Sequence, residues 1–217
     1  MDDSTIELCW LPLGAGPGGG PVRFSGRVYE ALAAWRGGRS RRALFHSALR
    51  VGAGGTVHTI EMAPVWAVAS PERGVVAEGA VGLPWLGRSR WFRYEVRRWA
   101  GGRIPDLEYS LDGPRPVPTD PERVTRLVEI VSEFPTVTWG RDELATGEMW
   151  NSNSLTSWLL ASSGHDVNDL TPPDSGRAPG WDAGLVVARR GAAARSRRRR
   201  ADLGAGPSRE HGGEVLE

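Results

Sequence analysis

The stretch that decides the fold is ALFHSALRV-GAGG-TVHTIEMA, residues 43–63, in which a glycine-rich turn separates two strand-like runs. This pattern predicts an antiparallel β-hairpin. With the turn centred on Ala53–Gly54, His46 falls opposite Glu61, and both side chains share one face of the hairpin. A one-residue change of register would exchange the two faces of the second strand, so that His58, instead of Glu61, would share the face of His46.

Four further runs predict strands around this hairpin. The clearest is RWFRYEVRRW, residues 90–99, where apolar and charged residues alternate with the period of two that marks a half-buried strand. We expect its charged side chains to form a solvated face; they include Arg93, Glu95 and Arg97. The other strand signals lie at 6–13, 75–81 and 183–188. Together these runs predict a mostly antiparallel sheet of about four to six strands.

Two segments carry strong helix signals. Asp120-Pro121-Glu122 supplies a cap, a proline at the first helical position and an early acid, so we expect a helix over about 121–134. The segment MWNSNSLTSWLL, residues 149–160, places capping residues before an apolar stripe, and Gly164 follows as a stop. It predicts a helix over about 152–163. The fold class is therefore α+β, a mostly antiparallel sheet with helices packed on one face.

The chain of 217 residues divides into a nearly neutral body and a basic tail. Residues 189–217 hold eight Arg against four acids, which leaves 19 Arg against 22 acids in residues 1–188. We expect residues 1–188 to form a single domain and residues 189–217 to be a disordered Arg-rich tail, because the tail lacks an apolar period. The body has no basic excess, which argues against nucleic-acid binding there. The Arg197–Arg200 run leaves open a contact with nucleic acid or anionic lipid, although a structureless tail is the commoner reading of such a run.

Several classes of protein are disfavoured by what the sequence lacks. It has no apolar run long enough to span a bilayer, and its first residues lack the pattern of a secretory signal. Cys9 is the only cysteine, which excludes an internal disulfide and fits a reducing compartment, so we expect a cytoplasmic protein. The histidines and acids do not have metal-site spacing, and the Gly/Pro loop at 14–21 lacks a phosphate-binding pattern. We therefore predict neither a metal nor a cofactor.

Ser154 falls in the first turn of the second helix, where free N–H groups and the positive end of the dipole favour an anion. A serine at this position is more often a cap than a nucleophile. Nucleophilic catalysis also needs a base and a group that orients the base, and His46 and Glu61 fill these roles if the helix packs across the hairpin. We then expect the three side chains to converge at one end of a cleft between sheet and helix.

Two of these segments carry a family resemblance. FHSAL, residues 45–49, resembles the histidine strand of the circularly permuted papain-like superfamily, which includes NlpC-type hydrolases and lecithin retinol acyltransferase-like proteins. NSNSL, residues 151–155, is similar to the Asn-Cys segment that opens the nucleophile helix of that superfamily. The resemblance covers residues 43–164 and implies the permuted papain-like α+β fold. The site residues that it implies are His46 as the base, Glu61 or His58 as the third polar residue, and Ser154 in the place of the cysteine.

The serine at the nucleophile position leads to two hypotheses about function. A hydroxyl ionises far less readily than a thiol, and a histidine that activates cysteine can fail to activate serine. The first hypothesis is therefore a catalytically impaired relative that keeps a groove for a small-molecule, lipid or peptide ligand, or for a partner. The alternative is an amide or ester hydrolase, or an acyltransferase, that uses Ser154 with His46 as base. Whether the protein is an enzyme stays open at this point.

Overall fold

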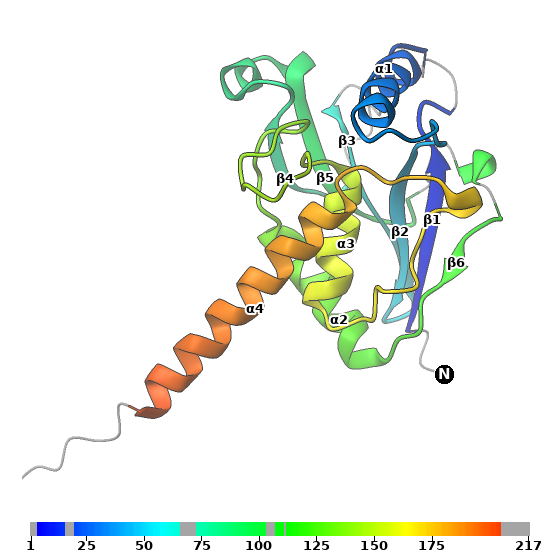
Figure 1. Cartoon of the computed structure of the whole chain (residues 1–217). Helices are drawn as coiled ribbons and strands as arrows, with labels where there is room; N and C mark the ends of the chain where they lie inside the picture. The colour runs from blue at the N-terminus through cyan, green and yellow to red at the C-terminus, as the bar shows by residue number, and fades with distance from the viewer. Residues whose placement is uncertain (1–3, 16–19, 66–72, 103–106, 111, 205–217) are drawn as a thin grey trace, which may run out of the picture.

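A computed structural model describes residues 4–15, 20–65, 73–102, 107–110 and 112–204. Its centre is a six-stranded sheet with the order β4-β5-β3-β2-β1-β6, in which every neighbouring pair is antiparallel (Figure 1). The strands are β1 (Thr5–Pro12), β2 (Phe45–Ala53), β3 (Thr56–Pro64), β4 (Val75–Ala80), β5 (Arg93–Ala100) and β6 (Arg115–Pro116). Within the described residues four α-helices accompany the sheet, so the expected α+β class is confirmed.

The two helices with the strongest sequence signals are confirmed. The α-helices are α1 (Gly20–Arg36), α2 (Pro121–Ile130), α3 (Ser152–Ser162) and α4 (Trp181–Gly204). Helices α2 and α3 pack on one face of the sheet, and α4 packs on α3 (Figure 1). Helix α1 departs from this arrangement, because it lies beyond one end of β1 and β2, where Gly26 faces Leu13 and Leu44. Short 3-10 turns join these elements, among them η2 (Pro84–Arg88) and η3 (Arg90–Phe92) between β4 and β5.

Strands β2 and β3 form the predicted hairpin, but in a different register. Leu49 pairs with Ile60, and the turn is centred on Gly54–Gly55. Both glycines have positive φ angles, 56° and 76°, which residues with a Cβ rarely adopt, so the turn settles one residue later than expected. The ladder ends at the Leu49–Ile60 pair. The expected pairing of His46 with Glu61 is therefore wrong.

The two faces of the sheet bury different kinds of side chain. The face covered by α2 and α3 holds the main apolar core, to which the sheet contributes Phe45, Leu49, Val51, Ile60 and Met62. The opposite face carries a smaller apolar cluster of Cys9, Leu11 and Ala48, with Leu107 packed against it. Any side chain of β2 belongs to one face or the other according to its parity along the strand.

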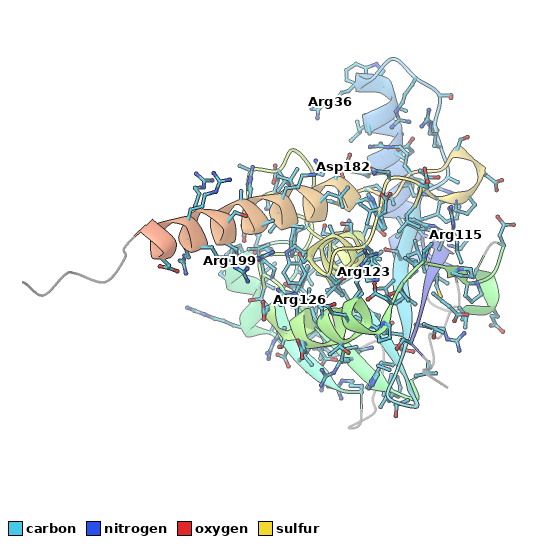
Figure 2. The ribbon with its side chains drawn as sticks, turned by 90° about the horizontal axis from the view of Figure 1, so that it is seen from below. Arg36, Arg115, Arg123, Arg126, Asp182 and Arg199 are labelled. Atoms are coloured by element: carbon cyan, nitrogen blue, oxygen red, sulfur yellow. The ribbon has the colours of Figure 1, made fainter. Side chains whose placement is uncertain are left out.

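The C-terminal segment differs most from the prediction. The strand expected over 183–188 is wrong, because these residues belong to α4, whose Ala183 and Gly184 pack closely on α3. Residues 189–204, for which we expected disorder, continue the same helix and project away from the body (Figures 1 and 2). Alanine and arginine both have high helix propensity, which explains the continuation. Residues 205–217 lie outside the described part of the chain.

Candidate functional site

Helix α3 begins with a complete capping box. The Asn151 side chain accepts hydrogen bonds from the backbone N–H groups of Asn153 and Ser154, at 2.9 and 3.4 Å. In return, the Ser154 hydroxyl accepts a hydrogen bond from the backbone N–H of Asn151 at 3.1 Å. These contacts satisfy donors that a helix N-terminus otherwise leaves free. The geometry is therefore that of a structural cap.

The Ser154 hydroxyl is also engaged as a donor. It donates to the backbone carbonyl of Gly180 at 2.8 Å, and the residue is 0% exposed. A serine nucleophile must be reached by its substrate and must pass its proton to a base. In this structure the proton of Ser154 is directed to a backbone carbonyl, and the hydroxyl has no contact with solvent.

Asn153 joins the same cluster to the sheet, a connection that the sequence did not reveal. Its amide donates to the carbonyls of Phe45 and Pro179 at 3.0 and 2.9 Å, and its side-chain oxygen accepts from the Ser47 hydroxyl at 2.9 Å. The polar first turn of α3 thus fastens β2 and the segment before α4 to the helix. The available signal was the NSNS run itself, since so many polar residues at a buried helix start need partners.

His46 lies on the opposite face of the sheet from Ser154. In the β1–β2 ladder it pairs with Leu11 of the smaller apolar cluster, whereas Ser47 pairs with Trp10 of the main core. Because neighbouring side chains on a strand point to opposite faces, the contact between Ser47 and α3 turns His46 away from that helix. The expected convergence of His46 with Ser154 is therefore wrong.

Burial lowers the pKa of His46 from 6.5 to about 4. Between pH 6.5 and pH 4, therefore, the imidazole stays neutral in the folded state, although it is protonated in the unfolded chain. As the pH falls from 6.5 towards 4, the unfolded state binds the additional proton, and the stability contributed by the neutral ring is lost.

We expect the variant His46→Leu to lose part of the acid sensitivity of the protein. Between pH 6.5 and pH 5 the wild-type chain should lose up to about 2 kcal/mol of unfolding free energy through this group, because one pKa unit corresponds to about 1.36 kcal/mol. Urea unfolding of both proteins at the two pH values measures the difference. Equal losses in the variant and the wild type would contradict a His46 ring that stays neutral in the folded state.

Glu61 belongs to a buried ion network on the same face as His46. The Arg97 guanidinium donates to Glu61 at 3.0 Å, to Glu95 at 2.9 Å and to the carbonyl of Pro64 at 3.1 Å. Arg73 adds two hydrogen bonds to Glu95, both at 2.7 Å. Arg97 is 0% and Glu95 1% exposed, so the expectation of a solvated charged face on β5 is wrong. Glu61 acts here as an ion-pair partner of Arg97, and Ser154 lies on the opposite face of the sheet.

His58, the other candidate for the third polar residue, is also remote from Ser154. It pairs with Val51 on the helix-covered face, six residues further along β2 than Phe45, which contacts the start of α3. At roughly 3.3 Å per residue this is a displacement of about 20 Å along the strand. Burial, with a smaller contribution from Arg98, lowers the pKa of His58. Its Nδ1 is buried and has no hydrogen-bond partner among the described residues.

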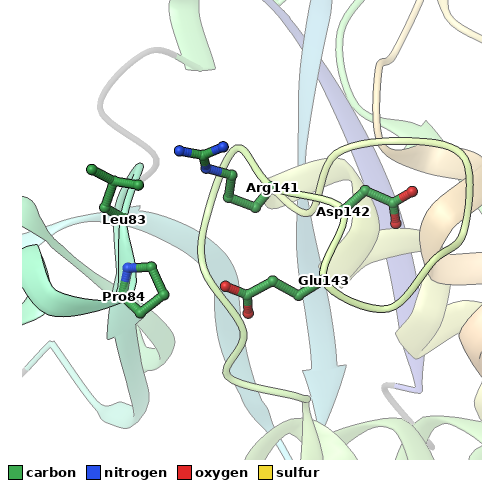
Figure 3. A pocket seen from close by; sticks show the side chains of 5 residues that line it. All are labelled: Leu83, Pro84, Arg141, Asp142 and Glu143. Carbon is green, nitrogen blue, oxygen red and sulfur yellow. The ribbon is translucent and has the colours of Figure 1, made fainter.

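A hollow lies at another place on the surface. It has a volume of about 390 Å³ and is formed by two loops, with Leu83 and Pro84 on one side and Arg141, Asp142 and Glu143 on the other (Figure 3). Its polar side chains already hold their loops in place. Arg141 donates to the carbonyl of Gly82 at 2.6 Å, and both acids accept backbone N–H groups. The hydrogen bond from the Thr146 backbone N–H is the main cause that lowers the pKa of Asp142. Hydrogen bonds from the side chain and then the backbone N–H of Thr138 lower the pKa of Glu143.

Comparisons with known proteins give no assignment for this arrangement. No protein-family model, no curated protein and no solved structure matches the chain. Among the described residues, no helix is both long enough and apolar enough to cross a membrane. In the same residues, no three histidine, cysteine or acidic side chains gather in a way that would hold a metal ion.

Proposed function

We propose that this protein is a non-catalytic binding protein in which Ser154 caps helix α3 instead of serving as a nucleophile. The site that the family resemblance implies is not assembled, because His46 faces away from α3. The main support for a non-catalytic role is the Ser154 hydroxyl, which is fully buried and already both accepts and donates a hydrogen bond. Ser47, and not the adjacent histidine, is the β2 side chain that meets this helix.

Incubation with a fluorophosphonate probe, read by intact mass, tests this proposal. We expect no adduct on the native protein, because the hydroxyl is inaccessible and has no base beside it. A soluble serine hydrolase of known activity is the positive control. A single adduct on Ser154 that disappears in His46→Ala would favour the alternative, a hydrolase or acyltransferase acting through an acyl-serine.

A cap has a measurable effect on stability. We expect Ser154→Ala to lower the free energy of unfolding by about 1–3 kcal/mol, because it leaves the Gly180 carbonyl and the Asn151 N–H buried without their partner. Ser162→Ala in the last turn of α3 is the matched control, and there we expect a change of less than about 0.5 kcal/mol. Equal effects in urea unfolding would contradict the structural role.

The binding surface that we propose is the aromatic segment, residues 84–92. Trp85, Trp91 and Phe92 are 64%, 66% and 44% exposed, although large aromatic side chains are usually covered. By contrast, Trp150 and Trp158 belong to the core, where both rings contact Phe134. The aromatic segment adjoins the hollow of Figure 3 through Pro84, so it offers protruding rings beside a concave surface. Exposed tryptophans are the side chains that most often dominate protein–protein contacts.

Selection of a displayed peptide library on the immobilised protein tests the position of this surface. We expect enriched peptides with apolar or aromatic anchors, and at least about a tenfold loss of their affinity in Trp85→Ser/Trp91→Ser, which corresponds to about 1.4 kcal/mol. Trp35→Ser is the matched control, because Trp35 on α1 is 78% exposed and lies outside the segment. Enriched peptides that bind all three proteins equally would show that the surface lies elsewhere.

A further inference from the structure

The second half of α4 stands free of the body. Among the described residues, the last hydrogen bond from α4 to the body comes from Arg190, whose guanidinium donates to the carbonyls of Leu144 and Ala145 at 2.6 and 3.0 Å. From 192 to 202 every residue is exposed. Figure 2 shows this part of the helix, with Arg199, extending away from the rest of the molecule. A helix that buries nothing has little tertiary packing to stabilise it.

This free segment carries a dense positive charge. It contains Arg195, Arg197, Arg198, Arg199 and Arg200, and the acid nearest to them along the helix is Asp202. Arg195 and Arg199 are four residues apart, a spacing at which like charges destabilise a helix. None of the salt bridges found among the described residues involves these five arginines. The segment is therefore electrostatically suited to a partner with many negative charges.

The distribution of the arginines narrows the choice of partner. Successive residues of an α-helix are rotated by about 100°, so these five side chains point to all sides of the helix. A helix that lies on a membrane needs a broad apolar face opposite its basic face. Between Ala192 and Asp202 the only apolar residues are alanines. A partner that surrounds the helix with negative charge fits this distribution better than a flat anionic surface does.

We infer that this segment of α4 binds double-stranded DNA in the major groove. The walls of that groove carry phosphates on two sides, and its width of about 12 Å accepts an α-helix. The deep and narrow major groove of double-stranded RNA does not admit such a helix. Residues 1–188 have more acids than arginines, so the contact is confined to the helix and the body is held away from the phosphates.

Fluorescence anisotropy of the full chain with a labelled DNA duplex of roughly 20 base pairs, about two helical turns, tests the inference. We expect the logarithm of the association constant to fall with the logarithm of the salt concentration with a slope of about −4 to −5, as for five neutralised phosphates. In the variant with all five arginines of the segment replaced by glutamine, we expect affinity to fall by at least about tenfold and the slope to approach zero. Glutamine keeps the helix propensity, and thermal unfolding checks that the body is intact.

The matched control is a variant in which five exposed arginines outside the α4 segment are replaced by glutamine, so that the same charge is removed. These residues are Arg27, Arg36, Arg41, Arg88 and Arg126. We expect this control to retain affinity within about threefold, because phosphate contacts, and not net charge, determine the salt slope. An equal loss in both variants would overturn the inference, as would equal or tighter binding of an RNA duplex. Binding to phosphatidylserine vesicles that the α4 variant alone loses, without DNA binding by the wild type, would overturn it in favour of a lipid surface.

Discussion

Replacing Arg97 with methionine is expected to lower the free energy of unfolding by about 3–5 kcal/mol, because removing one partner of a buried ion network leaves the other charges uncompensated. Arg97 is completely buried and pairs with Glu95 and Glu61. Methionine matches much of its volume and supplies no charge, so the variant leaves carboxylates in the interior with one cation fewer. Urea unfolding at neutral pH measures the loss.

Two companions show whether charge, and not volume, causes this loss. In Arg97→Met/Glu95→Gln the buried carboxylate is neutralised together with the cation, and we expect at least half of the lost stability to return. Arg50→Met removes a comparable Arg–Glu pair from the same sheet, but there both side chains are about a third exposed. We expect that change to cost less than about 1 kcal/mol. Similar losses for Arg97→Met and Arg50→Met would contradict the burial of the network.

The network also predicts a loss of stability in acid. Burial by itself would raise the pKa of Glu95, but the hydrogen bonds and charges of Arg73 and Arg97 outweigh it and hold the pKa below the ordinary value of 4.5. A carboxyl with a lowered pKa contributes its stability fully above that ordinary value and loses it as the pH falls through the folded-state value. The free energy of unfolding should therefore show a further decrease below about pH 4.5, and this decrease should be less steep in the neutralised double variant.

Gly184→Ala is expected to destabilise the protein by about 2–4 kcal/mol, against the usual direction for a helix. Within helices this change normally stabilises by about 0.5–1 kcal/mol. A Cβ at position 184 would stand 2.1 Å from the Ser157 hydroxyl and 2.3 Å from the Ser154 carbonyl. The Ser157 hydroxyl could rotate away, but the Ser154 carbonyl belongs to the backbone of α3. Either α4 shifts away or the start of α3 is distorted.

Gly191→Ala supplies the matched control in the same helix. There a Cβ would approach only the end of the flexible Arg195 side chain, at 3.3 Å. We expect the control to leave stability unchanged or to raise it by up to about 1 kcal/mol. Thermal and urea unfolding of both variants would decide the point. A Gly184→Ala protein as stable as the Gly191→Ala protein would contradict the close packing of α4 on α3.

Local sequence signals predicted the elements that depend on local physics. Helices α2 and α3 begin at capping residues and follow an apolar period, and both are found where the sequence placed them. The β2–β3 hairpin was predicted because glycines separate two strand-like runs, but its register depended on whether Ala53–Gly54 or Gly54–Gly55 formed the turn. Because side chains alternate along a strand, Ser47 and His46 must lie on different faces of the sheet. Which of these faces α3 covers depends on tertiary packing, which the strand sequence does not contain.

Other features depended on long-range contacts that no local pattern contains. The period of two in β5 placed Glu95 and Arg97 together on one face, but whether that face is covered cannot be read from the strand itself. The apolar run at 183–188 is too short for periodicity to separate strand from buried helix. Ser154 and Asn153 each donate a hydrogen bond to a carbonyl in the segment at 179–180, and nothing in the sequence links that segment to the NSNS run.

The buried charges of β3 and β5 also restrict the alignment in which these two strands can pair. Glu61 lies opposite Arg97, and both point to the same face. If β5 slipped by one residue, Arg97 would turn towards Ile60 and Met62 in the apolar core, and Glu61 would lose its partner. The charges therefore make a mispaired sheet far less favourable than the native pairing. During folding this selects one alignment of the central strands among alternatives that hydrophobicity alone would leave nearly equal.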